Sequence, residues 1–123
     1  MRIVYDTNFL MSIIKFRIDL FKELDLILDK PYENIIFDSV VTELRNLAKG
    51  KTKSSDEARI CLTFIKTKFH VIKALEGKVD DVIFSMSDED SAVATNDIEL
   101  RKRLKSKGIK TIYLRAKKHL AIS

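Results

Sequence analysis

The chain has 123 residues, of which 46% are hydrophobic and 33% are charged, and this length predicts one domain over residues 1–123 with its own core. A single cysteine, Cys61, excludes an intramolecular disulfide and a cysteine-rich metal site. The net charge of +5 permits a polyanionic partner such as RNA without proving one.

The first half of the chain predicts two strands and four helices. Short β-branched and aromatic runs indicate the strands, and apolar residues spaced by three and four indicate the helices. In order, the predicted elements are a strand over Arg2–Tyr5, two helices within residues 9–28 separated at Arg17 to Asp19, a strand over residues 34–37, a helix capped by Ser39 that ends at Gly50, and a helix opened by a capping box of Ser54 and Glu57.

The second half predicts three more strands. These are residues 70–75, 92–95 and 111–114, with helices at Val79–Met86 and after Asn96 or Asp97, and residues 115–123 form a tail. Strands that alternate with helices and are largely apolar are typical of a parallel sheet covered on both faces. We therefore expect a three-layer α/β/α fold with a mostly parallel central sheet of about five strands.

The start of the chain does not resemble a secretory signal. An acid, Asp6, stands where a signal would need an apolar run, and no stretch approaches the ~20 apolar residues of a membrane span. We expect a cytoplasmic protein with no membrane contact.

Acidic residues follow each of the first four predicted strands. Asp6 comes directly after the first strand, and Glu43 lies about one turn into the helix after the second strand. Asp80 and Asp81 open the helix after the third strand, and Asp97 follows the fourth. Carboxyl ends of parallel strands meet at one edge of the sheet. Carboxylates gathered there repel one another unless a cation shares them, and oxygen ligands suit Mg²⁺ or Mn²⁺.

Each of these acids also has a simpler interpretation. Asp6 and Asp97 could cap helices, and Glu43 could be a solvated helix residue. Helix geometry separates the adjacent pair: Asp80 projects about 110° from the apolar stripe and Asp81 about 150°, so Asp80 is the expected ligand and Asp81 the flanking acid.

Four segments together resemble a PIN domain. They are Asp6-Thr7-Asn8, Val41-Thr42-Glu43-Leu44, Val79-Asp80-Asp81 and Ala94-Thr95-Asn96-Asp97. The chain is most similar to the branch that holds VapC-like proteins and the PIN nuclease of small-subunit ribosomal RNA maturation. The resemblance implies a ribonuclease that uses Mg²⁺ or Mn²⁺. It further implies that the metal ligands and catalytic residues are Asp6, Glu43, Asp80 and Asp97, with Thr7, Asn8, Asp81 and Thr95 as supporting groups.

Basic residues predict a surface for the RNA backbone. Nine of them fall between Arg101 and Lys118 with no acid among them, and a further group flanks Gly50. A solvated helix face is the alternative interpretation. The residues expected to bind RNA are Lys51, Lys53, Arg101, Lys102 and Lys105. We expect no aromatic stacking platform, because the aromatic residues fall mostly at predicted core positions.

Two other functions remain open at this point. One is a non-catalytic RNA-binding or scaffold subunit of a ribonucleoprotein. The presence of all four acids argues against this function. The other is a phosphatase with Asp6 as nucleophile, which Asn8 disfavours because an amide cannot transfer a proton. The sequence does not separate a toxin with an antitoxin partner from a ribosomal RNA processing nuclease, and the resemblance is compatible with a homodimer.

Overall fold

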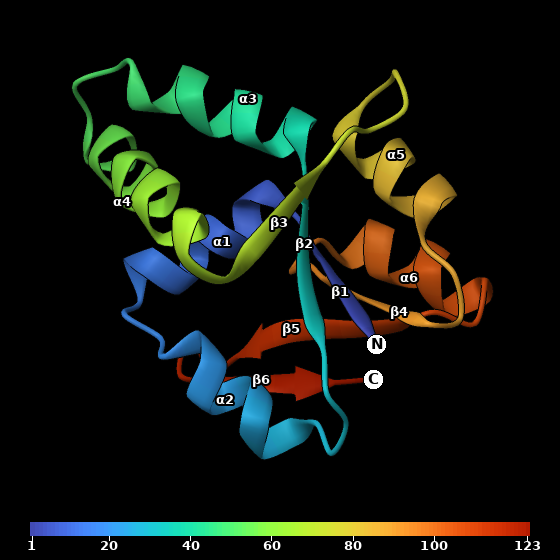
Figure 1. Cartoon of the computed structure of the whole chain (residues 1–123). Coiled ribbons are helices and arrows are strands. Elements are labelled where there is room, and N and C mark those ends of the chain that lie inside the picture. Colours follow the sequence, from blue (N-terminus) through green and yellow to red (C-terminus); the bar gives the residue numbers. More distant parts are fainter.

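A single six-stranded sheet forms the centre of the molecule in the computed structural model, which describes residues 1–123 (Figure 1). Its strand order is β3-β2-β1-β4-β5-β6, and all neighbours are parallel except β5 and β6. The strands are β1 (Arg2–Tyr5), β2 (Glu33–Phe37), β3 (Phe69–Ile72), β4 (Ser91–Ala94), β5 (Lys110–Arg115) and β6 (His119–Ile122). The helices are α1 (Thr7–Lys15), α2 (Leu20–Ile27), α3 (Asp38–Ala48), α4 (Lys53–Lys68), α5 (Val79–Met86) and α6 (Ile98–Ser106).

Alternating side chains of the strands divide the core between the two faces of the sheet. In β1, Ile3 and Tyr5 point to the larger core with α1 to α4, whereas Val4 points to the smaller core with α5 and α6. In β4, Ala92 on the larger-core side and Val93 on the smaller-core side divide in the same way. Figure 1 shows the two groups of helices on opposite sides of the strands. The three-layer α/β/α fold with a mostly parallel sheet is confirmed.

The strand order reverses between β1 and β4. The chain builds β1, β2 and β3 in one direction through the helices of the larger layer, and then returns to place β4 and β5 on the other side of β1. Ligands of open parallel sheets bind beyond the carboxyl ends of the strands at such a reversal. The residues that follow β1 and β4 therefore occupy the position where a functional site is expected.

Several predicted boundaries of the helices and strands were wrong. The capping box of α4 is formed by Thr52 and Ser55, not by Ser54 and Glu57, so this helix begins at Lys53. Both residue pairs have cap spacing, and the structure uses the earlier one. Similarly, α3 begins at Asp38, one residue before the predicted cap at Ser39, and β3 ends at Ile72 rather than at residue 75.

The expected tail contains a sixth strand. β6 returns antiparallel to β5 through a turn in which Ala116 and Lys117 have φ values of 53° and 56°. The left-handed conformation of two residues other than glycine left no turn signal in the sequence. Glu23 of α2 accepts a hydrogen bond from the backbone N–H of Leu120 at 3.0 Å and so ties β6 to the helix layer. Every helix is too short or too polar to span a membrane.

Candidate functional site

Asp6 stands at the carboxyl end of β1, where the sheet reverses. Its backbone N–H donates to the carbonyl of Ala94 on β4 at 3.0 Å, which carries the parallel pairing one residue beyond the strand. The side chain is only 5% exposed, and its Oδ2 accepts a hydrogen bond from Thr95 Oγ1 at 3.0 Å. Asp6 occupies the N-cap position of α1, as the alternative interpretation had it, but its side chain makes no cap hydrogen bond, so capping does not account for the carboxylate.

Glu43 reaches the same region from α3. Thr7, the first residue of α1, is buried and donates from Oγ1 to Glu43 Oε1 at 2.6 Å. This hydrogen bond holds an otherwise exposed carboxylate toward the end of β1. The second carboxylate oxygen of Glu43 has no protein partner, and the exposed Asn8 lines the cavity beside it.

Asp80 and Asp81 lie in the first turn of α5 with different surroundings. Asp80 is half-buried, whereas Asp81 is exposed and its Oδ1 lies 2.9 Å from the Nη1 of Arg103 on α6. This difference agrees with the helix geometry, which placed Asp80 nearer the core and Asp81 nearer solvent.

Asp97 completes the group from the residue before α6. Its Oδ1 accepts the backbone N–H of Leu100 at 3.0 Å, so the expectation of a helix cap is confirmed for this residue. Its own backbone N–H donates to Thr95 Oγ1 at 3.1 Å. Thr95, which is fully buried, therefore joins Asp97 to Asp6 through one hydroxyl.

Three of the four expected ligands line one cavity of about 450 Å³. Asp97 does not line it, but its charge acts on Asp80, as described below. The residues lining the cavity are Asp6, Thr7, Asn8, Glu43, Lys78, Val79, Asp80, Asp81 and Arg103.

Burial and neighbouring carboxylates raise the pKa values of Asp6 and Asp80. Burial raises the pKa of Asp6 from 3.8 to about 6, and the charges of Asp80 and Glu43 add to this rise while the Thr95 hydrogen bond opposes it. The pKa of Asp80 is also raised, first by burial and then by the charges of Asp97, Glu43 and Asp81. The cavity therefore holds an excess of negative charge that a cation would relieve.

The donor set fits a hard divalent cation in kind. Carboxylate oxygens are the ligands that Mg²⁺ and Mn²⁺ prefer, and neither His nor Cys lines the cavity. As the side chains stand, however, no three acidic, His or Cys side chains are close enough to hold one ion between them. In this arrangement Glu43 accepts a hydrogen bond from Thr7, and Asp97 accepts one from the first turn of α6.

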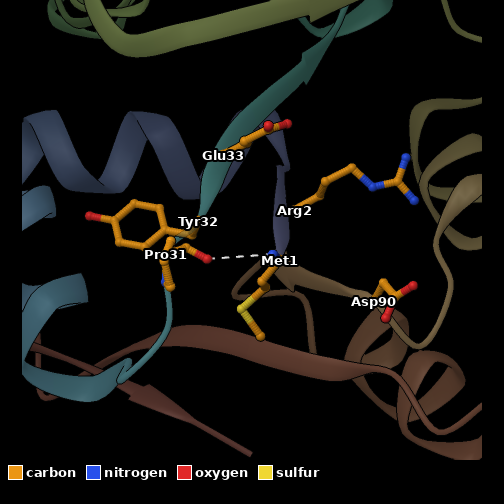
Figure 2. A pocket seen from close by; sticks show the side chains of 6 residues that line it. All are labelled: Met1, Arg2, Pro31, Tyr32, Glu33 and Asp90. Carbon is orange, nitrogen blue, oxygen red and sulfur yellow. Dashed lines mark hydrogen bonds between the residues drawn. The ribbon is translucent and has the colours of Figure 1, made fainter.

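A second cavity of about 450 Å³ lies at the opposite edge of the sheet (Figure 2). Its acidic lining residues are Glu33 and Asp90, and Met1 and Arg2, which carry positive charge, also line it. Figure 2 shows the amine directed to the carbonyl of Pro31, at 3.4 Å. Volume does not distinguish the two cavities, whereas the excess of carboxylates does.

The basic residues expected to bind RNA do not line the acidic cavity. Lys51 and Lys53 lie at the turn between α3 and α4, at the far end of α3 from β2 (Figure 1). Arg101, Lys102 and Lys105 line a separate hollow of about 210 Å³ between α6 and β5.

One aromatic ring lies among the basic residues of α6 and β5. The guanidinium of Arg101 lies 3.6 Å from the centroid of the Tyr113 ring, so a cation of the protein itself is stacked on this ring, and the absence of an aromatic platform for bases stays a prediction. Tyr113 is half-buried rather than part of the closed core, a difference that the apolar pattern of β5 did not indicate.

Two cations that sequence reasoning did not single out line the acidic cavity. Lys78 precedes α5, and Arg103 lies on α6 about 200° around the helix from Arg101. A helical projection of the basic run would have separated these two faces of α6, but only the fold shows which of them meets the acids.

Comparison with known proteins gives a consistent assignment. A family model described as "PIN like domain" matches residues 3–117. Ribonuclease VapC4 of Methanocaldococcus jannaschii is 30% identical, and the match covers 98% of this chain and 95% of that protein. The solved structure of the PIN domain endonuclease Utp24 superimposes with a TM-score of 0.82 at 27% identity, over 99% of this chain and 90% of the other.

A VapBC2 structure from Rickettsia felis, solved with a DNA fragment from its promoter, has a TM-score of 0.66 at 18% identity, over 92% of this chain and 98% of that one, and supports the fold alone. The superposition on the Utp24 PIN domain and the family match over nearly the whole sequence agree with one another. The chain belongs to the PIN-like domain family.

Proposed function

We propose that this protein is a ribonuclease that hydrolyses RNA phosphodiester bonds with Mg²⁺ or Mn²⁺. The observation that carries the proposal is the convergence of Asp6, Glu43 and Asp80 on one cavity at the sheet reversal, where the pKa values of Asp6 and Asp80 are raised by burial and by neighbouring carboxylates. The name of the 30% identical relative, a ribonuclease that the match covers over 95% of its length, supports RNA as the substrate.

The four acids have distinct parts in this proposal. Asp6 is the innermost of them, and the hydroxyl of Thr95 fixes its orientation from behind. Thr7 similarly fixes Glu43, while Asp80 is carried by α5. Asp6, Glu43, Asp80 and Asp97 would hold the cation, with side-chain rotation from the arrangement described above. When bound, a divalent cation supplies Lewis acidity toward water and toward the phosphate oxygens.

The remaining work of the chain is to orient the substrate and the acids. No Ser, Cys or His side chain occupies the cavity as a nucleophile or general base. Cys61 is buried on α4, and burial raises the pKa of its thiol to about 12. His70 on β3 and His119 on β6 lie outside the cavity. This arrangement favours direct attack of water on the phosphodiester over a covalent enzyme intermediate.

The proposal is tested by cleavage of a labelled single-stranded RNA with Mn²⁺, with Mg²⁺ and with chelator. We expect cleavage only with a divalent cation, and a loss of about 100-fold or more in Asp6→Asn, because even residues behind metal ligands are worth about 10–100-fold. Asp90→Asn is the matched control, since Asp90 lines the cavity at the opposite edge. Cleavage that persists in chelator, or in Asp6→Asn, contradicts the proposal.

The finer assignments remain predictions. The relatives include both a VapC ribonuclease and Utp24, so a toxin role and a ribosomal RNA processing role are both compatible with the chain. The VapBC structures are 18% and 13% identical and bear on the fold only, so an antitoxin partner and a homodimer stay predictions. Binding of the RNA backbone by Lys51, Lys53 and the basic hollow of α6 is likewise a prediction. RNA binding without cleavage by the wild-type chain would favour the scaffold alternative.

A further inference from the structure

The acidic cavity contains two cationic side chains, Lys78 and Arg103. Lys78 is exposed and has no ion-pair partner, whereas Arg103 is held in place. An RNA strand that enters this cavity brings negative phosphates next to Asp6, Glu43 and Asp80. Because like charges repel, a cation on the wall of the cavity would offset part of this repulsion and localise a phosphate.

Two side chains of α5 hold the guanidinium of Arg103. Its Nη1 donates to Asp81 Oδ1 at 2.9 Å, and its central carbon lies 4.5 Å from the centroid of the Phe84 ring. Asp81 and Phe84 are three residues apart and therefore share one face of the helix. Lys107 fixes the far end of this arrangement, because its ammonium donates to the carbonyl of Phe84 at 2.8 Å and to that of Ser87 at 3.0 Å.

The Arg103–Asp81 pair has little importance for stability. The two side chains are 44% and 58% exposed, and ion pairs at such sites contribute little to the folding free energy. The Arg103 guanidinium donates one N–H to Asp81 and has further N–H donors in the same plane. Their geometry matches the oxygens of a phosphate. The pair therefore restricts the orientation of Arg103 at the rim of the cavity without using all of its hydrogen-bonding capacity.

We propose that Arg103 is a phosphate-binding residue for the RNA backbone in this cavity, and that Asp81 is its positioning residue rather than a ligand of the cation. This inference rests on the proposed ribonuclease function. It assigns different roles to two adjacent acids: Asp80 is half-buried in the lining of the cavity, whereas Asp81 is exposed and paired with Arg103. It also separates Arg103 from the basic hollow of Arg101, Lys102 and Lys105, which lies on another face of α6.

The first test measures RNA affinity against salt in a non-cleaving Asp6→Asn background with Mg²⁺, by fluorescence anisotropy of a labelled single-stranded oligonucleotide. Arg103→Gln should lower the affinity and reduce the slope of log K against log salt by ~0.7, as expected for one lost phosphate contact. Arg103→Lys should keep the slope, because it retains the charge. The matched control is Arg45→Gln, an exposed arginine of α3 that lines a different, largely apolar hollow. An unchanged slope in Arg103→Gln overturns the proposal.

The second test addresses Asp81. Asp81→Asn should weaken RNA binding less than Arg103→Gln does, and should have almost no further effect when the two are combined, because it acts through the arginine. By calorimetry, Mn²⁺ affinity should fall less than about tenfold in Asp81→Asn and more than tenfold in Asp80→Asn. An equal or larger fall in Asp81→Asn overturns its assignment as a positioning residue.

These outcomes are distinguishable from failure of the ribonuclease proposal. If the wild-type chain does not cleave RNA, the ribonuclease proposal is wrong, whereas a lowered salt slope in Arg103→Gln would still identify the phosphate contact. A thermal melt of each variant guards against misfolding, and little change is expected because the pair is exposed. If Arg103→Gln melts below the assay temperature, the RNA affinities of Arg103→Lys and Asp81→Asn are compared instead. Loss of RNA affinity in Asp81→Asn alone supports the proposal, and no loss in either variant overturns it.

Discussion

Acidic residues lie at both ends of the central sheet, and the protein shifts their pKa values in opposite directions at the two ends. At the amino end, Asp88 accepts hydrogen bonds from the backbone N–H of Asp90, the hydroxyl of Ser91 and the guanidinium of Arg2. The Asp90 N–H is the largest cause that lowers the pKa of Asp88, followed by Ser91 and Arg2. At the carboxyl end, the pKa of Asp6 is raised to about 6 by burial and by neighbouring carboxylates.

The contrast distinguishes Asp88, whose charged form the folded protein stabilises, from Asp6, whose charged form it destabilises. Asp88 is paired within its own loop and with β1, so its charge is stabilised by the protein. Asp6 has one hydroxyl partner and two acidic neighbours, and its hydrogen bonds do not offset the cost of burying its charge, so a cation entering the cavity would stabilise that charge. Groups in this second condition are candidates for function, because structural stability alone would not retain them.

The largest expected effect is on the stability of Asp6→Asn in chelator. Because the folded pKa of Asp6 is raised, its protonated form contributes stability that is present below about pH 4 and lost as the pH rises through about 6. Asp6→Asn should therefore match the wild type near pH 4 and exceed it near pH 7.5 by on the order of 2–3 kcal/mol, at about 1.4 kcal/mol per pKa unit. Urea denaturation across this pH range measures the difference in unfolding free energy. Equal stability of Asp6→Asn and the wild type at pH 7.5 would show that the charge of Asp6 does not destabilise the folded protein.

An intermediate effect is expected for Thr95→Val. The substitution keeps the buried shape but removes the donor to Asp6 and leaves the backbone N–H of Asp97 without its partner. We expect a loss of roughly 1–3 kcal/mol in unfolding free energy and a fall of about 10–100-fold in Mn²⁺ affinity. Thr95→Ser should restore most of both. If Thr95→Val binds Mn²⁺ as the wild type does, Thr95 supports the fold and not the site.

The smallest effect on stability is expected for Asp88→Asn at the amino end of the sheet, and it has the opposite sign to that of Asp6→Asn. Because the pKa of Asp88 is lowered in the folded state, its carboxylate contributes stability that is present above its unfolded pKa and lost as the pH falls through the folded pKa. Asp88→Asn should therefore be slightly less stable than the wild type at neutral pH and equal to it in acid, by the same denaturation measurements. RNA cleavage should be unchanged. A gain in stability at neutral pH would remove the contrast between the two ends.

The sequence was sufficient for the fold and for the positions of the acids because both depend on local patterns. Apolar runs ended by Asp6 and by Thr95-Asn96-Asp97 mark two strand ends, and parallel strands must bring such ends to one edge. The apolar stripe of α5 similarly distinguished Asp80 from Asp81. These features need no knowledge of distant contacts.

The features that the sequence did not indicate depend on contacts between distant segments or on an unusual backbone. The pairing of Arg103 with Asp81 joins residues 22 positions apart, so the basic run gave no reason to separate Arg103 from Arg101. The turn before β6 uses left-handed Ala116 and Lys117, which carry no turn signal. The hydrogen bond from Thr7 to Glu43 spans two helices and is invisible in either one alone.

The central claim is that Asp6, Glu43, Asp80 and Asp97, at the carboxyl end of the sheet, hold a divalent cation. Mn²⁺ titration calorimetry at pH 7.5 tests this claim most directly. The account predicts that the wild-type chain binds Mn²⁺, that Asp6→Asn binds it at least about tenfold more weakly, and that Asp90→Asn at the opposite cavity binds it as the wild type does. Wild-type protein that binds no Mn²⁺, or equal affinity in Asp6→Asn, would contradict the account.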